Sequence, residues 1–453
     1  MDIEHPRSFS SLSLKFSENC SEFSGPDSQL KTAFLNEYLF YDKTPEVNKE
    51  NAIQYNLENL ESIRKDPFLC YQNVISNNPQ ELEHEYTRLT LALESLGWLF
   101  AGLPTSNQQA VSANQGTQVP PCLLIVDTTR EPDRKDLASL QAFTQLSKGA
   151  FLLGRSYLPF KDSPAAPPSA TDVLTYTPSF VTQKLENAFF LDKENPAVVG
   201  PFTWERVRGQ GQGVEGLCFE GAVAFCAKYS AVLLLEFTGF GATFTTSAFT
   251  SAALIQELGE KVKTMETYKN KVVVCGVYPE VRVSNEMTGS VITQIRKVDL
   301  EGIDMLLEQG YHYQVNLFGW LRAGLTIDEL AAMLQHVTNK YPTIHNISLG
   351  LGLIYKTEHS RFAGPGATLF VTLLEKLRER GLSVKHIQGL ICRNALNLVC
   401  WWRPLVLKKV EVILWKCDEC AKEFEESVPK ITKMDFQFCS PKCFKAGLKK
   451  IPK

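Results

Sequence analysis

The sequence has no long hydrophobic run, and its first residues do not have the pattern of a secretory signal. No apolar stretch approaches the roughly 20 residues that a membrane-spanning helix needs. The opening MDIEHPRSFSSLSLKF has neither the basic nor the apolar region of a signal peptide. We therefore expect a cytoplasmic protein, with the nucleus as the alternative compartment, and no membrane partner.

An excess of charge of either sign is also missing. The 453 residues include 47 Lys and Arg against 50 Asp and Glu, which gives a formal net charge of -3. A protein that binds nucleic acid over a broad surface usually has a basic excess, and here only the tail KCFKAGLKKIPK is basic. We do not expect a nucleic acid partner, and a nucleic-acid role for this tail is kept as a third alternative.

Histidine is scarce, and most of the cysteines stand alone. The chain has 7 histidines and 12 cysteines. In a reducing compartment an isolated cysteine is typically a small buried hydrophobic residue, whereas cysteines at short spacing indicate a metal site. The isolated cysteines are Cys20, Cys70, Cys122, Cys218, Cys226, Cys275, Cys392 and Cys400.

Short apolar runs that alternate with amphipathic stretches make up most of the chain. Residues 1–29 are polar and Ser-rich, which predicts a flexible N-terminal segment. From residue 30 onward, runs such as CLLIVDTT, AVLLLEFT and KVVVCGVY alternate with helical patterns such as DLASLQAFTQLSK and SAALIQELGEKVKTM. This alternation predicts parallel strands with helical crossovers, and counting eight such units favours an α/β fold, a (β/α)8 TIM barrel over residues 30–403.

Three segments carry a resemblance to a known family. They are KTAFLNEYLFYD, LLIVDTTREPDRKDLASLQAFTQLSKGAFLLGRSYLP and RFAGPGATLFVTLLEKLRERGLSVKHIQGLICRNALNLV. Together they resemble the phosphotriesterase-related branch of the amidohydrolase superfamily. The resemblance implies a (β/α)8 barrel with two divalent metals at the carboxyl ends of its strands, which activate a hydroxide to hydrolyse esters, amides or phosphotriesters.

The residues that such a metal centre needs are missing from the matching positions. The resemblance implies imidazoles at the ends of strands one, five and six, a bridging lysine or glutamate after strand four, and an aspartate after strand eight. The residues found at these six positions are Asn36, Tyr38, Pro201, Glu236, Gly276 and Gly352. Only Glu236 could still bind a metal, so the sequence predicts a catalytically inactive relative, a pseudoenzyme.

A rebuilt active site is the alternative. It would use polar residues near the predicted strand ends, where barrel enzymes carry their catalytic groups. These residues are Glu37, Tyr38, Glu236, Tyr278 and His359. His312 is a further candidate, because the sequence pattern does not assign it to a position remote from the strand ends. They predict either a divergent hydrolase of esters or amides, or a polar plug in the barrel mouth, where a small-molecule ligand could also bind.

Four cysteines near the end of the chain have the spacing of a zinc site. Cys417 and Cys420 form a Cys-x-x-Cys pair, and Cys439 and Cys443 form a Cys-x-x-x-Cys pair. Two such pairs complete a tetrahedral site with no position left for water, so we expect one structural zinc ion. Residues 404–453 would then form a small C-terminal zinc module, in which Ser440 and Pro441 start a short helix. A redox pair or unconnected thiols are the alternatives.

The zinc module is similar to small treble-clef or MYND-like modules that bind proteins, because an aromatic residue precedes CSPKC and a Cys-x-x-Cys pair lies upstream. This likeness implies a protein partner. The sequence as a whole therefore predicts a catalytically inactive phosphotriesterase-like protein that acts as a zinc-containing binding or adaptor protein.

Overall fold

The chain forms two compact units, Met1–Trp401 and Trp402–Lys453. Its structure is a computed structural model. The residues that it describes are 31–37, 39, 54, 56–65, 79–100, 123–129, 151–159, 176–191, 197–204, 207, 213–237, 251–275, 281–283, 293–295, 298, 300–322, 325–343, 345–352, 366–399, 414–417, 419–420, 423–425, 431–433, 436–438 and 440–447. Residues 1–29, expected to form a flexible segment, lie outside them.

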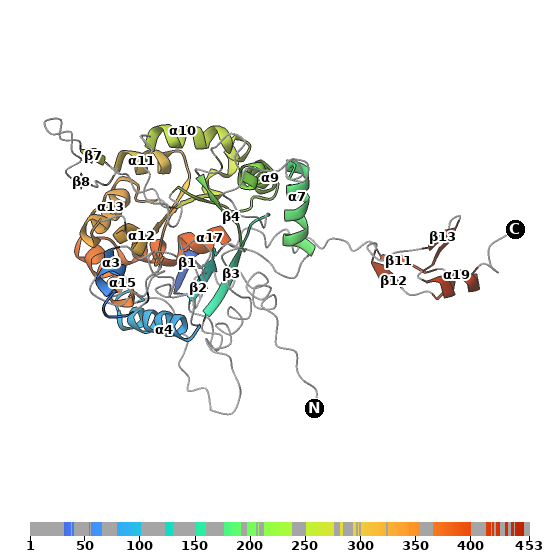
Figure 1. Cartoon of the computed structure of the whole chain (residues 1–453), viewed down its shortest axis with the longest axis horizontal. Coiled ribbons are helices and arrows are strands. Elements are labelled where there is room, and N and C mark those ends of the chain that lie inside the picture. Colours follow the sequence, from blue (N-terminus) through green and yellow to red (C-terminus); the bar gives the residue numbers. More distant parts are fainter. Residues whose placement is uncertain are drawn as a thin grey trace, which may run out of the picture. The chain divides into compact units, whose positions relative to one another are not determined.

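An eight-stranded parallel sheet is the centre of the first unit (Figure 1). Its spatial order follows the chain, apart from the hairpin inserted before the last two strands. The strands are β1 (Thr32–Glu37), β2 (Leu123–Asp127), β3 (Phe151–Tyr157), β4 (Val198–Thr203), β5 (Leu233–Glu236), β6 (Val272–Cys275), β9 (His312–Asn316) and β10 (Ile347–Gly350). Residues of β2, β4, β5, β6, β9 and β10 are buried without interruption, as parallel strands covered on both faces require.

The sheet closes on itself. Strands β1 and β10 stand at the two ends of the strand order, yet they lie in contact with each other. Next to this seam, the C-terminal helical stretch of the first unit contacts both strands, and the Asn394 side chain donates a hydrogen bond to the carbonyl of Ile347 in β10 at 2.8 Å. The architecture is the expected (β/α)8 barrel, with helices surrounding the strands (Figure 1).

The helices of the first unit fill the connections between the strands. They are α3 (Leu60–Lys65), α4 (Pro79–Ser95), α7 (Pro178–Glu186), α9 (Gly213–Tyr229), α10 (Ser251–Lys261), α11 (Leu300–Glu308), α12 (Leu317–Arg322), α13 (Ile327–Lys340), α15 (Gly366–Glu379), α16 (Val384–Gln388) and α17 (Asn394–Val399). Three further helical segments differ from the α-helix in their winding. The 3-10 helix η6 (Lys263–Lys271) is wound more tightly, and the π-helices η5 (Asn187–Leu191) and η7 (Gly389–Arg393) are wound more widely.

Local sequence signals explain where several of these helices begin. Thr326 caps α13 by accepting a hydrogen bond from the amide of Glu329, whose carboxylate accepts from the Thr326 amide in return. Thr177 caps α7, and Pro178 occupies the first helical position, where its missing N–H costs nothing. Apolar faces then hold the helices to the barrel, as in the edge-to-face contact of Phe34 in β1 with Phe370 in α15 at 5.5 Å between ring centroids.

The second unit contains two short antiparallel pairs and one helix. Strand β11 (Leu414–Lys416) pairs with β12 (Glu423–Glu425), and β13 (Ile431–Lys433) pairs with β14 (Phe436–Phe438). The helix α19 (Pro441–Gly447) starts as the sequence predicts, because the Cys443 amide donates to the Ser440 hydroxyl at 3.2 Å. The segment between the cysteine pairs thus contains the short antiparallel pair of β13 and β14, and it also supplies β12, which pairs with β11.

All eight apolar runs expected to be barrel strands are strands. The antiparallel hairpin of β7 (Val281–Val283) and β8 (Thr293–Ile295) was not expected. The helix expected at DLASLQAFTQLSK lies outside the described residues. None of the helices in the described ranges combines the length and the apolar character that a bilayer crossing demands.

Gly352 provides a test of how closely the chain is packed at the barrel seam. Its φ is +66°, and a Cβ there would lie 2.7 Å from the Cβ of Asn316. Gly352→Ala should therefore lower the free energy of unfolding by about 3 kcal/mol, because it adds a clash with the Asn316 side chain to the left-handed strain. The matched control is Gly381→Ala, where φ is +89° but no atom lies within 4 Å of the new Cβ. That change should cost only about 1 kcal/mol in chemical denaturation. Equal costs would contradict the close approach at Gly352.

Candidate functional site

The carboxylate of Glu37 lies at the carboxyl end of β1 and is fully buried. Its oxygens accept hydrogen bonds from the amides of Leu351 at 2.7 Å and Gly352 at 2.8 Å, which directly follow β10. The hydroxyl of Tyr86 in α4 donates a further hydrogen bond at 3.2 Å. Burial and the neighbouring carboxylate raise the pKa of Tyr86 well above its usual value, so this hydroxyl keeps its proton. Glu37 thus joins the first and last strands of the barrel.

Two glycines leave the space that this arrangement needs. A Cβ on Gly350 would lie 2.6 Å from Asn316 Oδ1 and from Gln314 Nε2, and 3.1 Å from Glu37 Oε1. Gly352 has a positive φ and lies against Asn316. A side chain at either position would displace the Glu37 carboxylate or its neighbours. The position where the resemblance implies a catalytic aspartate is therefore occupied by backbone that donates to Glu37.

A row of polar side chains runs along β9 and β10 from this point. Gln314 Nε2 donates to Asn316 Oδ1 at 2.9 Å, and the Ser348 hydroxyl donates to Gln314 Oε1. His312 Nε2 lies 2.7 Å from the same hydroxyl. Because the single Ser348 proton points to Gln314, His312 Nε2 must be the donor in the last contact. Each of these side chains is thus hydrogen-bonded to its neighbour in the row.

His312 is the buried end of this row. Burial, and then the positive charge of Lys271, lower the pKa of His312 to about 3. The imidazole is therefore neutral at physiological pH. It lies at the first residue of β9, the opposite end from the strand termini where barrel enzymes place catalytic groups.

Asp127 plays a similar structural role at the end of β2. Its Oδ1 accepts hydrogen bonds from the amides of Leu39 and Thr129, both at 3.1 Å, and lies 2.6 Å from the Thr129 hydroxyl oxygen. The Thr128 amide donates to the carbonyl of Glu37 at 2.8 Å. These contacts fix the segments that leave β1 and β2. Asp127 was missed in the sequence, although its place at the end of an apolar run is a signal for such a residue.

Aromatic side chains cover the ends of β4 and β5. Trp204 directly follows β4, Phe237 directly follows β5, and their rings stack with 5.1 Å between centroids and an interplanar angle of 17°. The neighbouring Thr203 amide donates to the carboxylate of Glu215 in α9. Glu236, the last residue of β5, is 4% exposed. The described part of this edge thus combines stacked aromatic rings with two buried acids, Glu215 and Glu236.

The residues proposed from the sequence are only partly brought together. Asn36 lies within β1, Pro201 is buried within β4 after a cis peptide bond, and Gly352 follows β10. Glu37 and Glu236 are the last residues of their strands, but the Glu37 carboxylate is hydrogen-bonded to the amides that follow β10. The remaining members, Tyr38, Gly276, Tyr278 and His359, lie outside the described residues.

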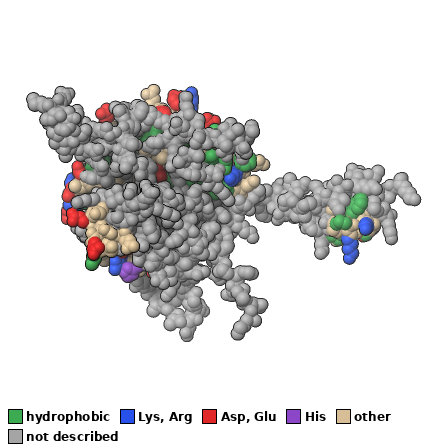
Figure 2. Space-filling model, viewed as in Figure 1, with side chains coloured by type: hydrophobic (Ala, Val, Ile, Leu, Met, Phe, Trp, Pro, Cys, Tyr) green, Lys and Arg blue, Asp and Glu red, His purple; other side chains and the backbone are tan. Residues whose placement is uncertain are grey.

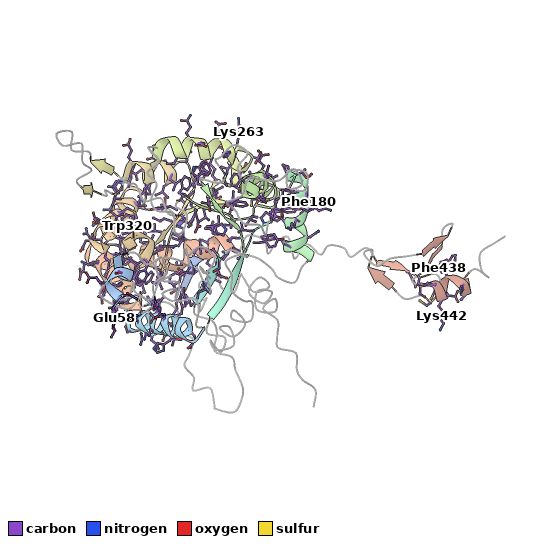
Figure 3. All side chains as sticks on the ribbon, in the orientation of Figure 1. Glu58, Phe180, Lys263, Trp320, Phe438 and Lys442 are labelled. Atoms are coloured by element: carbon purple, nitrogen blue, oxygen red, sulfur yellow. The ribbon has the colours of Figure 1, made fainter. Side chains whose placement is uncertain are left out.

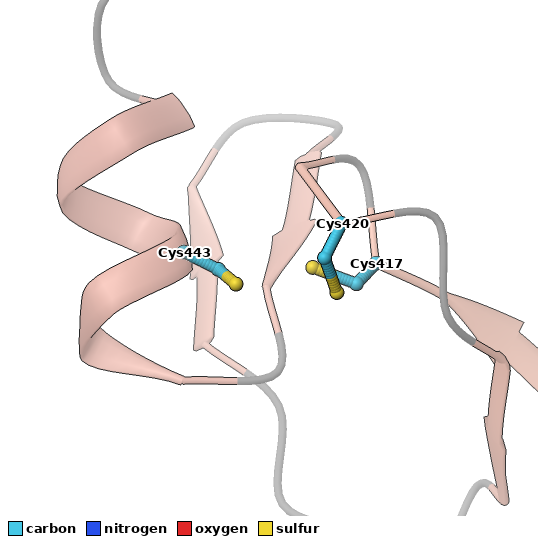
Figure 4. A group of neighbouring side chains, drawn as sticks. All are labelled: Cys417, Cys420 and Cys443. Carbon is cyan, nitrogen blue, oxygen red and sulfur yellow. The ribbon is translucent and has the colours of Figure 1, made fainter.

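Three of the four predicted zinc ligands converge in the second unit (Figure 4). Cys417 follows β11, Cys420 lies in the next turn, and Cys443 projects from the first turn of α19. Their sulfur atoms all lie within 4.8 Å of one another. The fourth expected ligand, Cys439, lies outside the described residues.

This cluster fits a zinc ion. A tetrahedral zinc site with Zn–S bonds of about 2.3 Å separates its sulfurs by about 3.8 Å, which is compatible with the observed cluster. The position of Cys443 follows from the Ser440 cap and from the contact of Phe438 with Phe444, whose ring centroids are 5.5 Å apart. Phe438 is buried against α19, whereas Lys442 points away from the unit (Figure 3). Figure 2 shows basic and apolar side chains together on this unit, where Lys442 and Lys445 are exposed.

Comparisons with known proteins find a family match for the second unit and a similar fold among solved structures. Residues 413–449 match the family described as the Vms1-associating treble clef domain. A resiniferatoxin-binding protein from Rhodobacter sphaeroides superposes with a TM-score of 0.54 at 15% identity, covering 82% of this chain and 92% of that chain. A phosphotriesterase homology protein from Escherichia coli, complexed with phosphate in its active site, gives 0.49 at 11% identity, covering 82% and 99%. No curated protein matches the sequence.

A lactonase from Listeria monocytogenes is also similar, with a TM-score of 0.49 at 9% identity, covering 83% of this chain and 96% of that chain. At such identities the likeness is one of fold, and the match with a TM-score of 0.54 carries it. The expected barrel fold is confirmed by that match, and the phosphotriesterase homology protein and the lactonase are solved structures to which this chain is similar. The expected treble-clef likeness of the C-terminal segment is confirmed by the family match.

Removing the hydrogen-bonding groups of Glu37 and Tyr86, where β1 meets β10, should lower the stability of the first unit. We expect Glu37→Gln to lower the free energy of unfolding by about 3 kcal/mol, because an amide NH2 would face backbone donors. Tyr86→Phe should cost about 1.5 kcal/mol, the usual contribution of a hydrogen bond to a charged group. The matched control is Tyr341→Phe, which removes a hydroxyl that donates to Glu308 at 2.6 Å on the surface. Chemical denaturation should show little change for this control, and an equal loss would contradict the special role of Glu37.

The buried imidazole predicts a pH dependence. His312 in the unfolded chain gains a proton below about pH 6.5, whereas the folded chain resists protonation down to about pH 3. Stability should therefore fall as the pH falls through this window, by about 1.4 kcal/mol per pH unit from this group. Denaturation between about pH 7 and pH 5 should show a flatter profile for His312→Gln than for the wild type. The control is His345→Gln, which changes an exposed histidine, and an equal flattening in this variant would contradict the assignment to His312.

Proposed function

We propose that this chain is a non-catalytic binding protein of the phosphotriesterase-like fold, whose zinc-bound treble clef unit docks a protein partner. The family match of residues 413–449 supports the protein-binding role, since that family is described as associating with Vms1. The barrel would serve as a scaffold, with its mouth available for docking or for a small-molecule ligand. A nucleic acid partner is not part of this proposal.

The hydrogen bonds to Glu37 are the observation that carries the loss of catalysis. A binuclear hydrolytic centre needs imidazoles, a bridging group and an aspartate that accepts a proton from the nucleophilic water. At the strand-eight position the chain instead has Gly352, whose amide donates to Glu37 at 2.8 Å. Within the described residues, the cysteine cluster is the group of candidate ligands that could hold a metal ion. This arrangement supports the dismantling of the centre at Asn36, Tyr38, Pro201, Glu236, Gly276 and Gly352.

The proposed zinc ion has a structural role. Cys417, Cys420, Cys439 and Cys443 together would supply four thiolates, which leave no coordination position for a water molecule. The second unit is too small to be stabilised by an apolar core alone, whereas zinc contributes about 10 to 16 kcal/mol to isolated fingers. Thiolates stay available for zinc in a reducing compartment, which fits the proposed cytoplasmic location.

A hydrolase with a rebuilt site is the second candidate. The observation in its favour is Glu236, a buried acid at the carboxyl end of β5, where barrel enzymes carry catalytic groups. Against it stands Glu37, whose carboxylate is held by the β10 amides and Tyr86 and so lacks the freedom of a general base. Tyr38, Tyr278 and His359 would have to complete this site.

Metal content and turnover of the full chain test the proposal together. We expect close to one zinc per chain, and no hydrolysis of esters, lactones, phosphotriesters or N-acyl amino acids. Cys443→Ser should remove most of the zinc, whereas Cys226→Ala, which changes a buried thiol in α9, should retain it. Two metal ions per chain, or turnover that Glu236→Gln abolishes, would contradict the binding role and favour the hydrolase.

A further inference from the structure

The three clustered cysteines differ sharply in their exposure. Cys417 is 1% exposed, Cys443 is half-buried and Cys420 is exposed to solvent. A solution oxidant therefore meets Cys420 before the other two described members of the cluster. Two residues separate Cys417 from Cys420 in the sequence, and the sulfur of Cys417 lies within 4.8 Å of the Cys420 sulfur (Figure 4).

The described cysteines of the barrel lack this access to solvent. Cys218, Cys226, Cys275 and Cys392 are all buried. Burial raises the pKa of Cys226 well above its usual value and raises that of Cys392 to about 12. These two thiols stay protonated and shielded, so they are poor nucleophiles toward an oxidant.

We propose that Cys420 is a site of oxidation by hydroperoxides, which joins it to Cys417 in a disulfide and releases the zinc ion. The inference rests on the proposed zinc-binding role of the cluster. It adds a modification that would control whether the second unit can bind its partner.

Two balanced steps describe the reaction. The Cys420 thiolate attacks the terminal oxygen of the hydroperoxide: the S–O bond forms, the O–O bond breaks, and the departing alkoxide takes a proton to become an alcohol. The Cys417 thiolate then attacks the Cys420 sulfur, so that the S–S bond forms and the S–O bond breaks, and hydroxide leaves as water after taking a second proton. Two thiolates are oxidised by two electrons in total, and the hydroperoxide is reduced by two.

The geometry favours Cys417 over Cys443 as the second cysteine. Cys417 and Cys420 are separated by two residues, so the loop that a disulfide closes is short and its closure costs little further entropy. Cys443 is instead held on α19 by the Ser440 cap and the Phe438–Phe444 contact. Loss of two of its thiolates leaves zinc with too few ligands, and α19 is then no longer tied to the turn after β11.

Limited peroxide treatment of the zinc-loaded full chain tests this proposal. Hydrogen peroxide is added in steps, released zinc is followed with a chromophoric chelator, and the oxidised cysteines are mapped by peptide mass spectrometry. We expect zinc release to parallel the appearance of a Cys417–Cys420 disulfide, with the barrel cysteines still reduced. First oxidation at Cys443 or at a barrel cysteine would overturn the proposal.

Two histidine substitutions form a matched pair, because imidazole can replace a thiolate as a zinc ligand. Cys420→His should slow peroxide-driven zinc release by roughly tenfold, since the exposed thiolate is gone. Cys443→His keeps the Cys417–Cys420 pair and should release zinc at close to the wild-type rate. Equal rates for both variants would contradict the assignment to Cys420. If a variant does not hold zinc, the disulfide mapping in the wild type decides alone.

The outcomes separate this proposal from the function on which it rests. A wild-type chain purified without zinc would contradict the proposed function, and the release step with it. A chain that holds one zinc ion but keeps Cys417 and Cys420 reduced under peroxide would contradict only the oxidation.

Discussion

The closure of the barrel depends on one buried carboxylate. Glu37 ends the first strand and accepts hydrogen bonds from two consecutive amides that follow the last strand, 314 and 315 residues further along the chain. A buried carboxylate is costly unless donors surround it, and here the backbone of β10 and the hydroxyl of Tyr86 provide them. The contacts between the first and last strands therefore also satisfy this acid, which supports its structural role in the proposal.

This constraint extends along the seam. Gly350 and Gly352 leave room for Glu37 and Asn316, and Asn316 is bonded to Gln314, which is bonded to Ser348 and through it to His312. Such a row stabilises the fold only when each member has its partner. Polar groups that satisfy one another in this way are poorly placed to hold metal ions. The hydrogen bonds among these buried polar residues thus give them a structural role in the fold.

The sequence predicted the barrel well and its polar contacts poorly, for a physical reason. A strand buried on both faces favours a run such as VVVC or LLLE, so the strands could be found from such runs and from their alternation with helical patterns. Glu37 was recognised as an acid at a strand end, but its partners come from the other end of the chain, and no local pattern encodes such a pairing. The Ser440 cap and the cysteine pairs were predictable because their interactions are local. The hairpin of β7 and β8 was missed because each strand spans only three residues.

The two units satisfy their polar groups by different means, and this difference decides where the chain can be controlled. The barrel has an extensive core, and its buried acids Glu37 and Asp127 are held by backbone amides and hydroxyl groups. The second unit brings three cysteine sulfurs within 4.8 Å of one another, and the proposed zinc ion would hold them together. Under this proposal, the fold of the unit depends on metal supply and on the redox state of Cys420, the most exposed of the three. A binding surface on this unit would then be lost while the barrel stays folded, so regulation would act on the unit proposed to meet the partner.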